Sequence, residues 1–227
     1  SAVIPRIQDA TFTAAVHPEA DVAAVMARTL GCGAWDRSLA GLLTHGAAEF
    51  DAVLIDSSGS ARHQIVHEAA AAGKHVLVET PLAPSIQDAD SAIVTCSEAG
   101  VCLMVGHASR FVPANLKVKE SLASGTLGAP GMLRIHRWEP MVAGGGLHSM
   151  RDSESPYGGA GGQVARDLDM ATWMFETLPT EVYALARKLS NPEMDVYDYV
   201  QVHLGFPHGG MCLIDYSMAL PRGEDYF

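Results

Sequence analysis

Two hydrophobic patterns alternate along the first hundred residues. Short apolar runs rich in β-branched residues are followed by longer stretches in which apolar positions recur every three or four residues, as in strands followed by amphipathic helices. Strands are predicted at residues 11–16, 51–56, 75–79 and 101–105, and helices at 19–30, 38–44, 60–72 and 85–98. The apolar runs do not alternate with polar residues, so we expect these strands to be buried on both faces. Strand–helix repeats at this spacing predict a doubly wound, parallel α/β sheet.

After Gly106 the pattern changes to helices followed by strands of alternating character. Helices are predicted at 115–123 and 163–175, and strands at 132–138, 181–187, 199–205 and 211–217. The segment PHGG at 207–210, between the last two strands, has the composition of a hairpin turn. We therefore predict one domain at 1–106 and an α+β domain with a largely antiparallel open sheet at 107–227.

Residues 141–162 lie between a predicted strand and a predicted helix and contain seven glycines. An irregular segment of this length in a compact domain is either functional or unstructured. Because it carries Tyr157 beside several other polar side chains, it is a candidate substrate lid. The sequence leaves both alternatives open.

Composition narrows the classes of function. The chain has 15 basic and 26 acidic side chains and a formal net charge of −11, whereas nucleic-acid surfaces need clustered Lys and Arg. Its four cysteines form no C-x-x-C pair, so we expect free thiols in a reducing cytoplasm.

His63 and His67 lie four residues apart on one predicted helix, but a third ligand is lacking and no metal is expected. No apolar run is long enough to cross a bilayer, so no membrane partner is expected.

Four segments of the chain together carry a family resemblance. They are residues 73–83 (GKHVLVETPLA), 105–111 (VGHASRF), 125–128 (GTLG) and 167–173 (DLDMATW). In order and spacing they resemble the glucose–fructose oxidoreductase/inositol dehydrogenase (Gfo/Idh/MocA) family. The resemblance implies a Rossmann-type domain that binds NAD or NADP and a C-terminal sheet whose outer face makes a homo-oligomer contact. It also implies hydride transfer to or from a small sugar, cyclitol or related hydroxy or carbonyl compound.

The resemblance further implies that the first strand of the family fold is missing from this chain. The family starts with a strand and a G-x-G-x-x-G loop that binds the pyrophosphate, whereas this chain starts at what matches the second strand. We therefore expect a fragment that lacks the first strand and is incomplete at both ends. Gly31 and Gly33 are no substitute for the loop, because they follow a predicted helix and Asp36 stands in place of the third glycine. They are expected to end that helix.

Three positions that are catalytic in the family are changed together. The resemblance places its lysine at Thr80, its histidine at Arg166, and the aspartate four residues before that histidine at Gly162. A threonine hydroxyl is a poor acid or base. Arginine stays protonated, so Arg166 can clamp an anionic group but cannot act as a base. Two hypotheses follow: an active but atypical NAD(P)-dependent oxidoreductase, with Thr80 and Arg166 converging on one cleft, or a non-catalytic binding or scaffolding protein, with Arg166 held in a salt bridge.

Three further side chains are candidates for the chemistry. His107 is the candidate for proton transfer, because imidazole titrates near neutrality; a structural hydrogen bond at a strand end is the alternative. Asp167 and Asp169 are candidates for contacting the substrate or for orienting Arg166. Alternatively, the two aspartates cap the start of a helix, where the helix dipole favours carboxylates.

Cofactor contacts are expected at the carboxyl ends of the strands, where α/β sheets bind ligands. Ser57 and Ser58 follow one predicted strand, Glu79 and Pro81 follow the next, and Arg110 comes shortly after the last.

His17 stands where the family has an acidic residue that binds the ribose hydroxyls. Neutral imidazole is a weaker partner for a diol and tolerates a 2′-phosphate. A simple helix-start position before Pro18 is an equally good interpretation.

Overall fold

The structure, a computed structural model, describes residues 9–46, 49–57, 59–83, 85–140, 160–190, 193 and 197–220. The chain forms two compact units. The first comprises residues 1–57, 61–78 and 87–104, and the second comprises residues 58–60, 79–86 and 105–227. Residues 79–86 thus belong to the second unit although they precede position 106, and the boundary proposed there stays a prediction.

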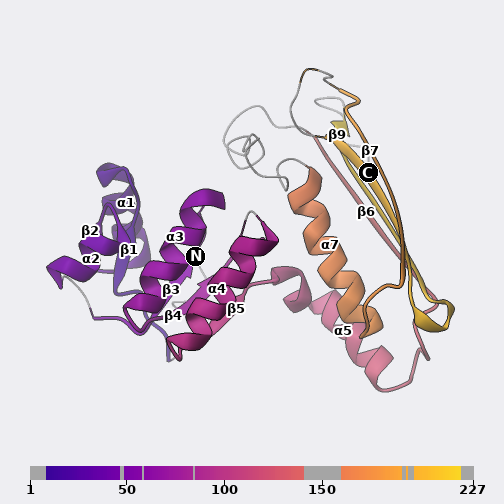
Figure 1. The fold of residues 1–227 in the computed structure, drawn as a ribbon, viewed down its shortest axis with the longest axis horizontal. Coiled ribbons are helices and arrows are strands. Elements are labelled where there is room, and N and C mark those ends of the chain that lie inside the picture. The colour runs from indigo at the N-terminus through magenta and orange to yellow at the C-terminus, as the bar shows by residue number, and fades with distance from the viewer. Residues whose placement is uncertain are drawn as a thin grey trace. The chain divides into compact units, whose positions relative to one another are not determined.

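Strands and helices alternate through the first unit (Figure 1). In chain order they are β1 (Ala14–Val16), α1 (Ala20–Leu30), β2 (Ala34–Asp36), α2 (Leu39–His45), β3 (Ala52–Ile55), α3 (Gly59–Ala71), β4 (His75–Val78), α4 (Ile86–Glu98) and β5 (Leu103–Val105). β1 and β2 form one parallel sheet, and the order β3-β4-β5 forms another in which β3 and β4 are parallel. The predicted α/β architecture is confirmed, although the three-residue strand β2 was not predicted.

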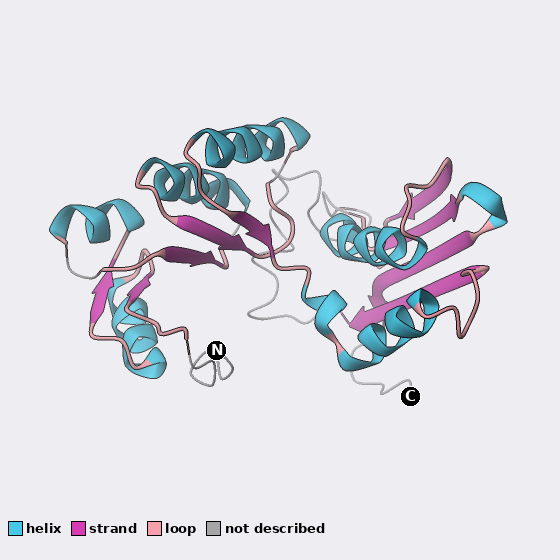
Figure 2. Ribbon diagram, turned by 90° about the horizontal axis from the view of Figure 1, so that it is seen from below, coloured by secondary structure: helices cyan, strands magenta, loops and turns pink. Residues whose placement is uncertain are grey.

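Helices α3 and α4 lie side by side along one face of the β3-β4-β5 sheet (Figure 2). Ile55 and Val78, which are neighbours across β3 and β4, are 2% and 0% exposed on the buried face of these strands. Leu54 and Met104, by contrast, are 47% and 52% exposed. The prediction that these strands are buried on both faces is therefore wrong for the described residues, because α3 and α4 lie along one face only.

Helix α1 ends in a glycine turn that confirms the sequence prediction. Gly31 has φ 74°, a left-handed conformation that glycine adopts without a Cβ penalty. Its N–H donates to the carbonyl oxygen of Arg28, and the N–H of Cys32 donates to that of Ala27, 3.0 Å away. Cys32 then packs with Ala15 and Ala27 in a small buried cluster. This segment ends a helix and does not form a phosphate-binding loop.

The second unit places helices beside a four-stranded sheet. Its elements are η2 (Ala108–Phe111), α5 (Pro113–Ala123), β6 (Met132–Pro140), α7 (Ala160–Phe175), β7 (Glu181–Arg187), β8 (Tyr199–Gly205), η3 (Pro207–Gly209) and β9 (Met211–Leu220). The sheet order is β6-β9-β8-β7, with β6 parallel to β9 and the other pairs antiparallel. The prediction of a largely antiparallel sheet is confirmed. Helix α7 begins within the predicted loop 141–162, and residues 141–159 lie outside the described residues.

The core of the second unit lies between α7 and the sheet (Figure 1). Ile214 and Tyr216, alternate residues of β9, are both fully buried there. Phe175 at the end of α7 stacks on Phe206 with ring centroids 4.0 Å apart. A Cβ atom on Gly210 would lie 2.4 Å from the Phe175 ring, so only glycine leaves room for this stack. Within the described segments, no helix is both long enough and apolar enough to span a membrane.

A buried carboxylate just before β8 accepts hydrogen bonds from residues that follow β7. Asp198 is 1% exposed. Its Oδ1 accepts the N–H of Leu189 at 2.7 Å, and its Oδ2 accepts both the N–H of Ser190, also at 2.7 Å, and the Ser190 hydroxyl. Burial by itself raises the pKa of Asp198, but the hydrogen bonds from Ser190 and Leu189 outweigh it and hold this pKa below its usual value. Asp198 is therefore a structural anion.

Candidate active site

Two segments that follow adjacent strands contact each other in the second unit. Glu79 and Thr80 follow β4, and Gly106 follows β5. The N–H of Thr80 donates to Oε2 of Glu79 at 3.3 Å, and the peptide bond from Thr80 to Pro81 is cis. A Cβ atom on Gly106 would lie 3.3 Å from Oε1 of Glu79, so the glycine lets the carboxylate approach the chain. Glu79, Thr80 and Gly106 thus form one cluster at the strand ends.

His107 turns the chain from β5 into η2. Its φ of 39° is left-handed, which few residues other than glycine adopt. Its carbonyl oxygen accepts the N–H of Arg110 at 2.9 Å, and its Nδ1 lies 3.1 Å from Oδ2 of Asp169 on α7. The angles at this contact are not those of a hydrogen bond. A neutral imidazole with its proton on Nδ1, near the carboxylate, has Nε2 as an acceptor. The side chain is 27% exposed, so it is reachable from solvent.

Asp169 also binds Arg110 in a bidentate ion pair. Nε of Arg110 donates to Oδ2 at 2.8 Å and Nη2 donates to Oδ1 at 2.5 Å. The hydrogen bonds that Arg110 donates to Asp169 raise the pKa of Arg110 above its usual value. The guanidinium also lies 5.8 Å from the centroid of the Trp173 ring. A cofactor contact, which we predicted for Arg110, would therefore fall chiefly to its Nη1.

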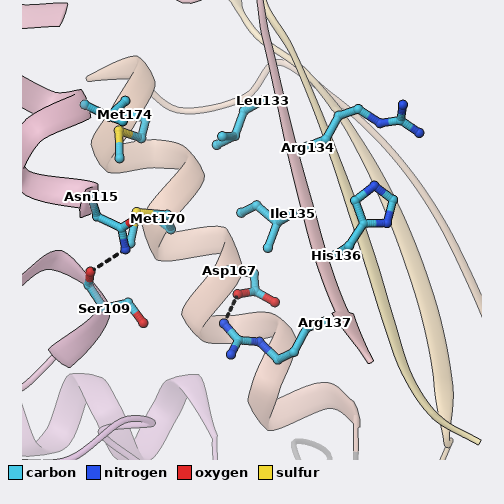
Figure 3. A pocket seen from close by; sticks show the side chains of 11 residues that line it. Ser109, Asn115, Leu133, Arg134, Ile135, His136, Arg137, Asp167, Met170 and Met174 are labelled. Carbon is cyan, nitrogen blue, oxygen red and sulfur yellow. Dashed lines mark hydrogen bonds and ion pairs between the residues drawn. The ribbon is translucent and has the colours of Figure 1, made fainter. Parts of the chain in front are cut away.

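A cavity of about 350 Å³ lies between η2, α5, β6 and α7 (Figure 3). Ile135 and Arg137 of β6 point towards α7, whereas Arg134 and His136 point away from it. Nη2 of Arg137 donates to Oδ1 of Asp167 at 2.8 Å. Asp167 is 2% exposed, and its Oδ2 has no hydrogen-bond partner among the described residues.

The Arg137–Asp167 ion pair belongs to the helix–sheet interface. Burial, together with the charge of Asp167, raises the pKa of Cys212 on β9 to about 11, so that thiol is unreactive near neutral pH. Because α7 begins at Ala160, neither Asp167 nor Asp169 caps the helix start, and that predicted alternative is wrong. Arg137 was missed by sequence reasoning, although a charged residue in phase with the inward positions of an alternating strand was an available signal.

Arg166 lies on α7 next to Asp167 and is half-buried. Among the described residues it forms no ion pair, so the salt bridge expected for a scaffolding protein finds no support there. Thr80 and Arg166 belong to the same unit. Their convergence on one cleft stays a prediction.

In the first unit, polar groups stand at the strand ends. Ser57 follows β3, and its buried Oγ has no hydrogen-bond partner among the described residues. Because α/β sheets bind ligands at this place, an unsatisfied hydroxyl fits a partner supplied by a bound dinucleotide. His17 follows β1, and its Nδ1 accepts the N–H of Glu19 at 3.1 Å. Ser58 and Tyr157 lie outside the described residues.

The histidine pair of α3 is a packing contact. The rings of His63 and His67 are 4.3 Å apart, and the two ring nitrogens of His67 lie 3.0 Å from the Thr95 hydroxyl and 3.4 Å from the Ser91 hydroxyl on α4. Burial and the neighbouring His63 lower the pKa of His67. Across the described residues, no three His, Cys, Asp or Glu side chains are grouped so that they could hold a metal ion.

The first unit is a parallel α/β fold with unsatisfied polar groups at its strand ends, and the second is an α+β fold with a mixed sheet. This combination is that of the Rossmann-type dinucleotide-binding class of proteins. The chain belongs to the Gfo/Idh/MocA oxidoreductase family. The family's NAD-binding Rossmann fold matches residues 2–107, and its C-terminal domain matches residues 115–227. The family resemblance found in the sequence is thereby confirmed.

Named relatives include enzymes that act on sugars and cyclitols. The chain is 34% identical to a myo-inositol 2-dehydrogenase of Thermotoga maritima, over 77% of this chain and 52% of that protein. It is 28% identical to a 1,5-anhydro-D-fructose reductase of Ensifer adhaerens, over 72% of this chain and 49% of that protein. A crystal structure of a probable dehydrogenase from Thermotoga maritima superimposes with a TM-score of 0.84 at 29% identity, covering 96% of this chain and 65% of that one. The chain thus spans about half the length of the curated relatives that it matches.

Proposed function

We propose that the protein is an NAD(P)-dependent oxidoreductase that transfers hydride to or from a small sugar, cyclitol or related hydroxy or carbonyl compound. The observation that carries this proposal is the 3.1 Å separation between Nδ1 of His107, just after β5, and Oδ2 of Asp169; the two atoms are within ion-pair distance, although they do not have the angles of a hydrogen bond. A base beside a carboxylate, which stabilises the protonated form of that base, is what oxidation of an alcohol needs when the usual lysine and histidine are replaced. Membership of the family and the names of its relatives support the reaction class.

The nicotinamide, when bound, supplies the hydride acceptor or donor. In the direction of oxidation, Nε2 of His107 takes the hydroxyl proton as the carbon gives up its hydride, and the alcohol becomes a carbonyl. Asp169 stabilises the imidazolium that forms, while Arg110 holds Asp169 in place. In the reverse direction the imidazolium returns the proton. Thr80 would donate a hydrogen bond to the substrate oxygen, and Arg166 would hold an anionic group.

A substitution at His107 tests the proton-transfer role. His107→Asn keeps a residue that tolerates a left-handed backbone but cannot accept a proton at neutral pH. We expect kcat to fall about a hundredfold to ten-thousandfold, while the affinity for the reduced nicotinamide cofactor changes little. The measurement uses full-length protein, with cofactor binding followed by fluorescence and turnover followed by nicotinamide absorbance over a panel of inositols and aldoses.

His208→Asn is the matched control, because His208 also has a left-handed backbone (φ 67°) but lies in the η3 turn. It should leave kcat unchanged. Failure of the wild-type protein to bind either NADH or NADPH would end the proposal. Full activity of His107→Asn would remove His107 from the mechanism.

We also propose that the sheet of the second unit pairs with a second copy of the protein. On the face away from the buried core, Trp138 and Tyr183 are 47% and 64% exposed, and Met132 and Met211, which are neighbours across β6 and β9, are 57% and 53% exposed. A sheet face on which several large apolar side chains are exposed together is typical of an interaction surface. The family resemblance supports a homo-oligomer at this face.

Trp138→Glu is expected to weaken this association about 30-fold or more, as removal of a central aromatic side chain does at other interfaces. Light scattering over a dilution series of the full-length protein measures the effect. Leu178→Glu is the control, because Leu178 is 74% exposed but lies between α7 and β7, outside the sheet. A monomeric wild-type protein, or equal weakening by both substitutions, would contradict the assignment.

A further inference from the structure

The carboxyl ends of β1 and β2 bring two basic side chains together in the first unit. The N–H of His17 donates to the carbonyl oxygen of Asp36 at 3.2 Å, extending the β1–β2 pairing by one residue. Arg37 follows immediately, and its Nε donates to the carbonyl oxygen of Pro18 at 2.9 Å. His17 and Arg37 are therefore held next to each other by backbone contacts on both sides. Neither contact was foreseen from the sequence, because β2 itself was not predicted.

The tautomer of His17 is set by its neighbour. The N–H of Glu19 donates to Nδ1 of His17 at 3.1 Å, so Nδ1 carries a lone pair. In the neutral ring the proton must then lie on Nε2. His17 consequently offers a donor, and the single acceptor on its ring is already occupied.

Arg37 likewise keeps donors available. Only Nε contacts the protein through a hydrogen bond among the described residues, so the two terminal nitrogens can form the paired hydrogen bonds with which guanidinium recognises phosphate. The side chain is exposed. A ligand can thus reach it without displacing another group.

The carboxylate of Asp36, the residue before Arg37, is bonded within its own loop. Oδ1 of Asp36 accepts the N–H groups of Arg37 and Ser38, and Oδ2 lies 3.1 Å from Nδ1 of His45. A Cβ atom on Gly41 would lie 2.3 Å from Oδ1, so that glycine is needed for Asp36 to take this position. Asp36 is therefore engaged by its own loop and is not available to accept hydrogen bonds from a ribose.

In Rossmann-type sheets, an acidic residue near this place binds the ribose 2′-hydroxyl of NAD, whereas a nearby arginine accommodates the 2′-phosphate of NADP. We propose that His17 and Arg37 form a subsite for the 2′-phosphate of the adenosine ribose, and that the protein prefers NADP(H) to NAD(H). This inference rests on the proposed function, which requires a nicotinamide dinucleotide. The terminal nitrogens of Arg37 take two phosphate oxygens, and Nε2–H of His17 takes the third. The competing assignment is that Glu19, whose side chain is exposed at the start of α1, binds an unphosphorylated ribose.

Binding of nucleotides to the full-length protein, measured by calorimetry, tests the subsite without turnover. We expect NADPH to bind at least about tenfold more tightly than NADH, and 2′,5′-ADP to bind more tightly than its isomer 3′,5′-ADP. Arg37→Ala should weaken NADPH and 2′,5′-ADP by about 10- to 100-fold, as expected for lost hydrogen bonds to a charged group, and should leave NADH unchanged. Arg37→Lys should be intermediate, because an ammonium cannot form the paired contact. His17→Asp should reverse the preference.

Arg28→Ala is the matched control, because Arg28 lies in the last turn of α1, at the far end of the helix from His17. Equal or tighter binding of NADH by the wild-type protein overturns the inference, as does equal binding of the two ADP isomers. If Glu19→Gln weakens NADH binding while Arg37→Ala changes nothing, the ribose contact belongs to Glu19 and the inference is wrong. If 2′,5′-ADP binds in an Arg37-dependent manner but neither dinucleotide binds, the subsite stands and the proposed oxidoreductase function fails.

Discussion

Arg137→Met is expected to lower the free energy of unfolding of the second unit by about 3 kcal/mol, the effect of leaving a buried charge without its partner. Asp167 is 2% exposed, and the Nη2 of Arg137 donates to its Oδ1 at 2.8 Å. Methionine fills similar space but cannot compensate the carboxylate. Urea unfolding followed by tryptophan fluorescence measures the change, because Trp138 and Trp173 both lie in this unit.

Two further variants separate the ion pair from the general effect of replacing an arginine. Arg134→Met, two residues earlier on β6, alters a side chain that points away from α7, so it should change stability by less than about 0.5 kcal/mol. The double variant Arg137→Met with Asp167→Leu should recover most of the loss, because an apolar pair of similar volume needs no charge compensation. If the double variant is no more stable than Arg137→Met alone, the ion pair is not the source of the effect.

Asp198→Ala is expected to cost about 3 kcal/mol at neutral pH, because three hydrogen bonds to a buried carboxylate are lost together. The cost should depend on pH. The pKa of Asp198 in the folded protein lies below its ordinary value of 3.8. Its contribution is therefore complete above that ordinary value and disappears as the pH falls through the lower, folded value.

Thermal unfolding of the wild type and of Asp198→Ala between neutral pH and pH values below 3.8 measures this convergence. Glu120→Ala is the control, since the Glu120 side chain is 67% exposed on α5 and its removal should shift the curve little at any pH. A difference that stays constant down to the most acidic pH would show that packing, and not the ionised carboxylate, holds this loop.

The family and most of the elements were readable from the chain because their signals are local. A helix of eleven residues such as α1 has its own periodicity, and Gly31 marks its end through a conformation that depends only on that residue. The strands β7 and β8 were predicted at their observed bounds, because polar, proline-containing segments delimit them on both sides. By contrast, β2 has three residues and no periodicity, and exists because Ala34 pairs with Ala14 on β1.

The candidate active site was only partly readable. Its members Thr80, His107 and Asp169 were identified as separate motif positions, but their partners were not. The sequence predicted that Asp169 contacts the substrate or orients Arg166, three positions earlier. In the structure Asp169 contacts Arg110 and His107, which lie about sixty positions earlier. Arg166 itself forms no ion pair within the described part of the chain.

The sequence by itself determined the family, the order of the helices and strands other than β2, and which residue types stand at the strand ends, because each follows from neighbours along the chain. The tertiary structure alone decided which partners the charged side chains have. Packing joined Asp167 to Arg137, Asp169 to Arg110, and Arg37 to the segment after β1. The reason is that a charged side chain selects its partner by proximity within a partly desolvated space, and that space forms only after α7 packs on its sheet and β2 pairs with β1.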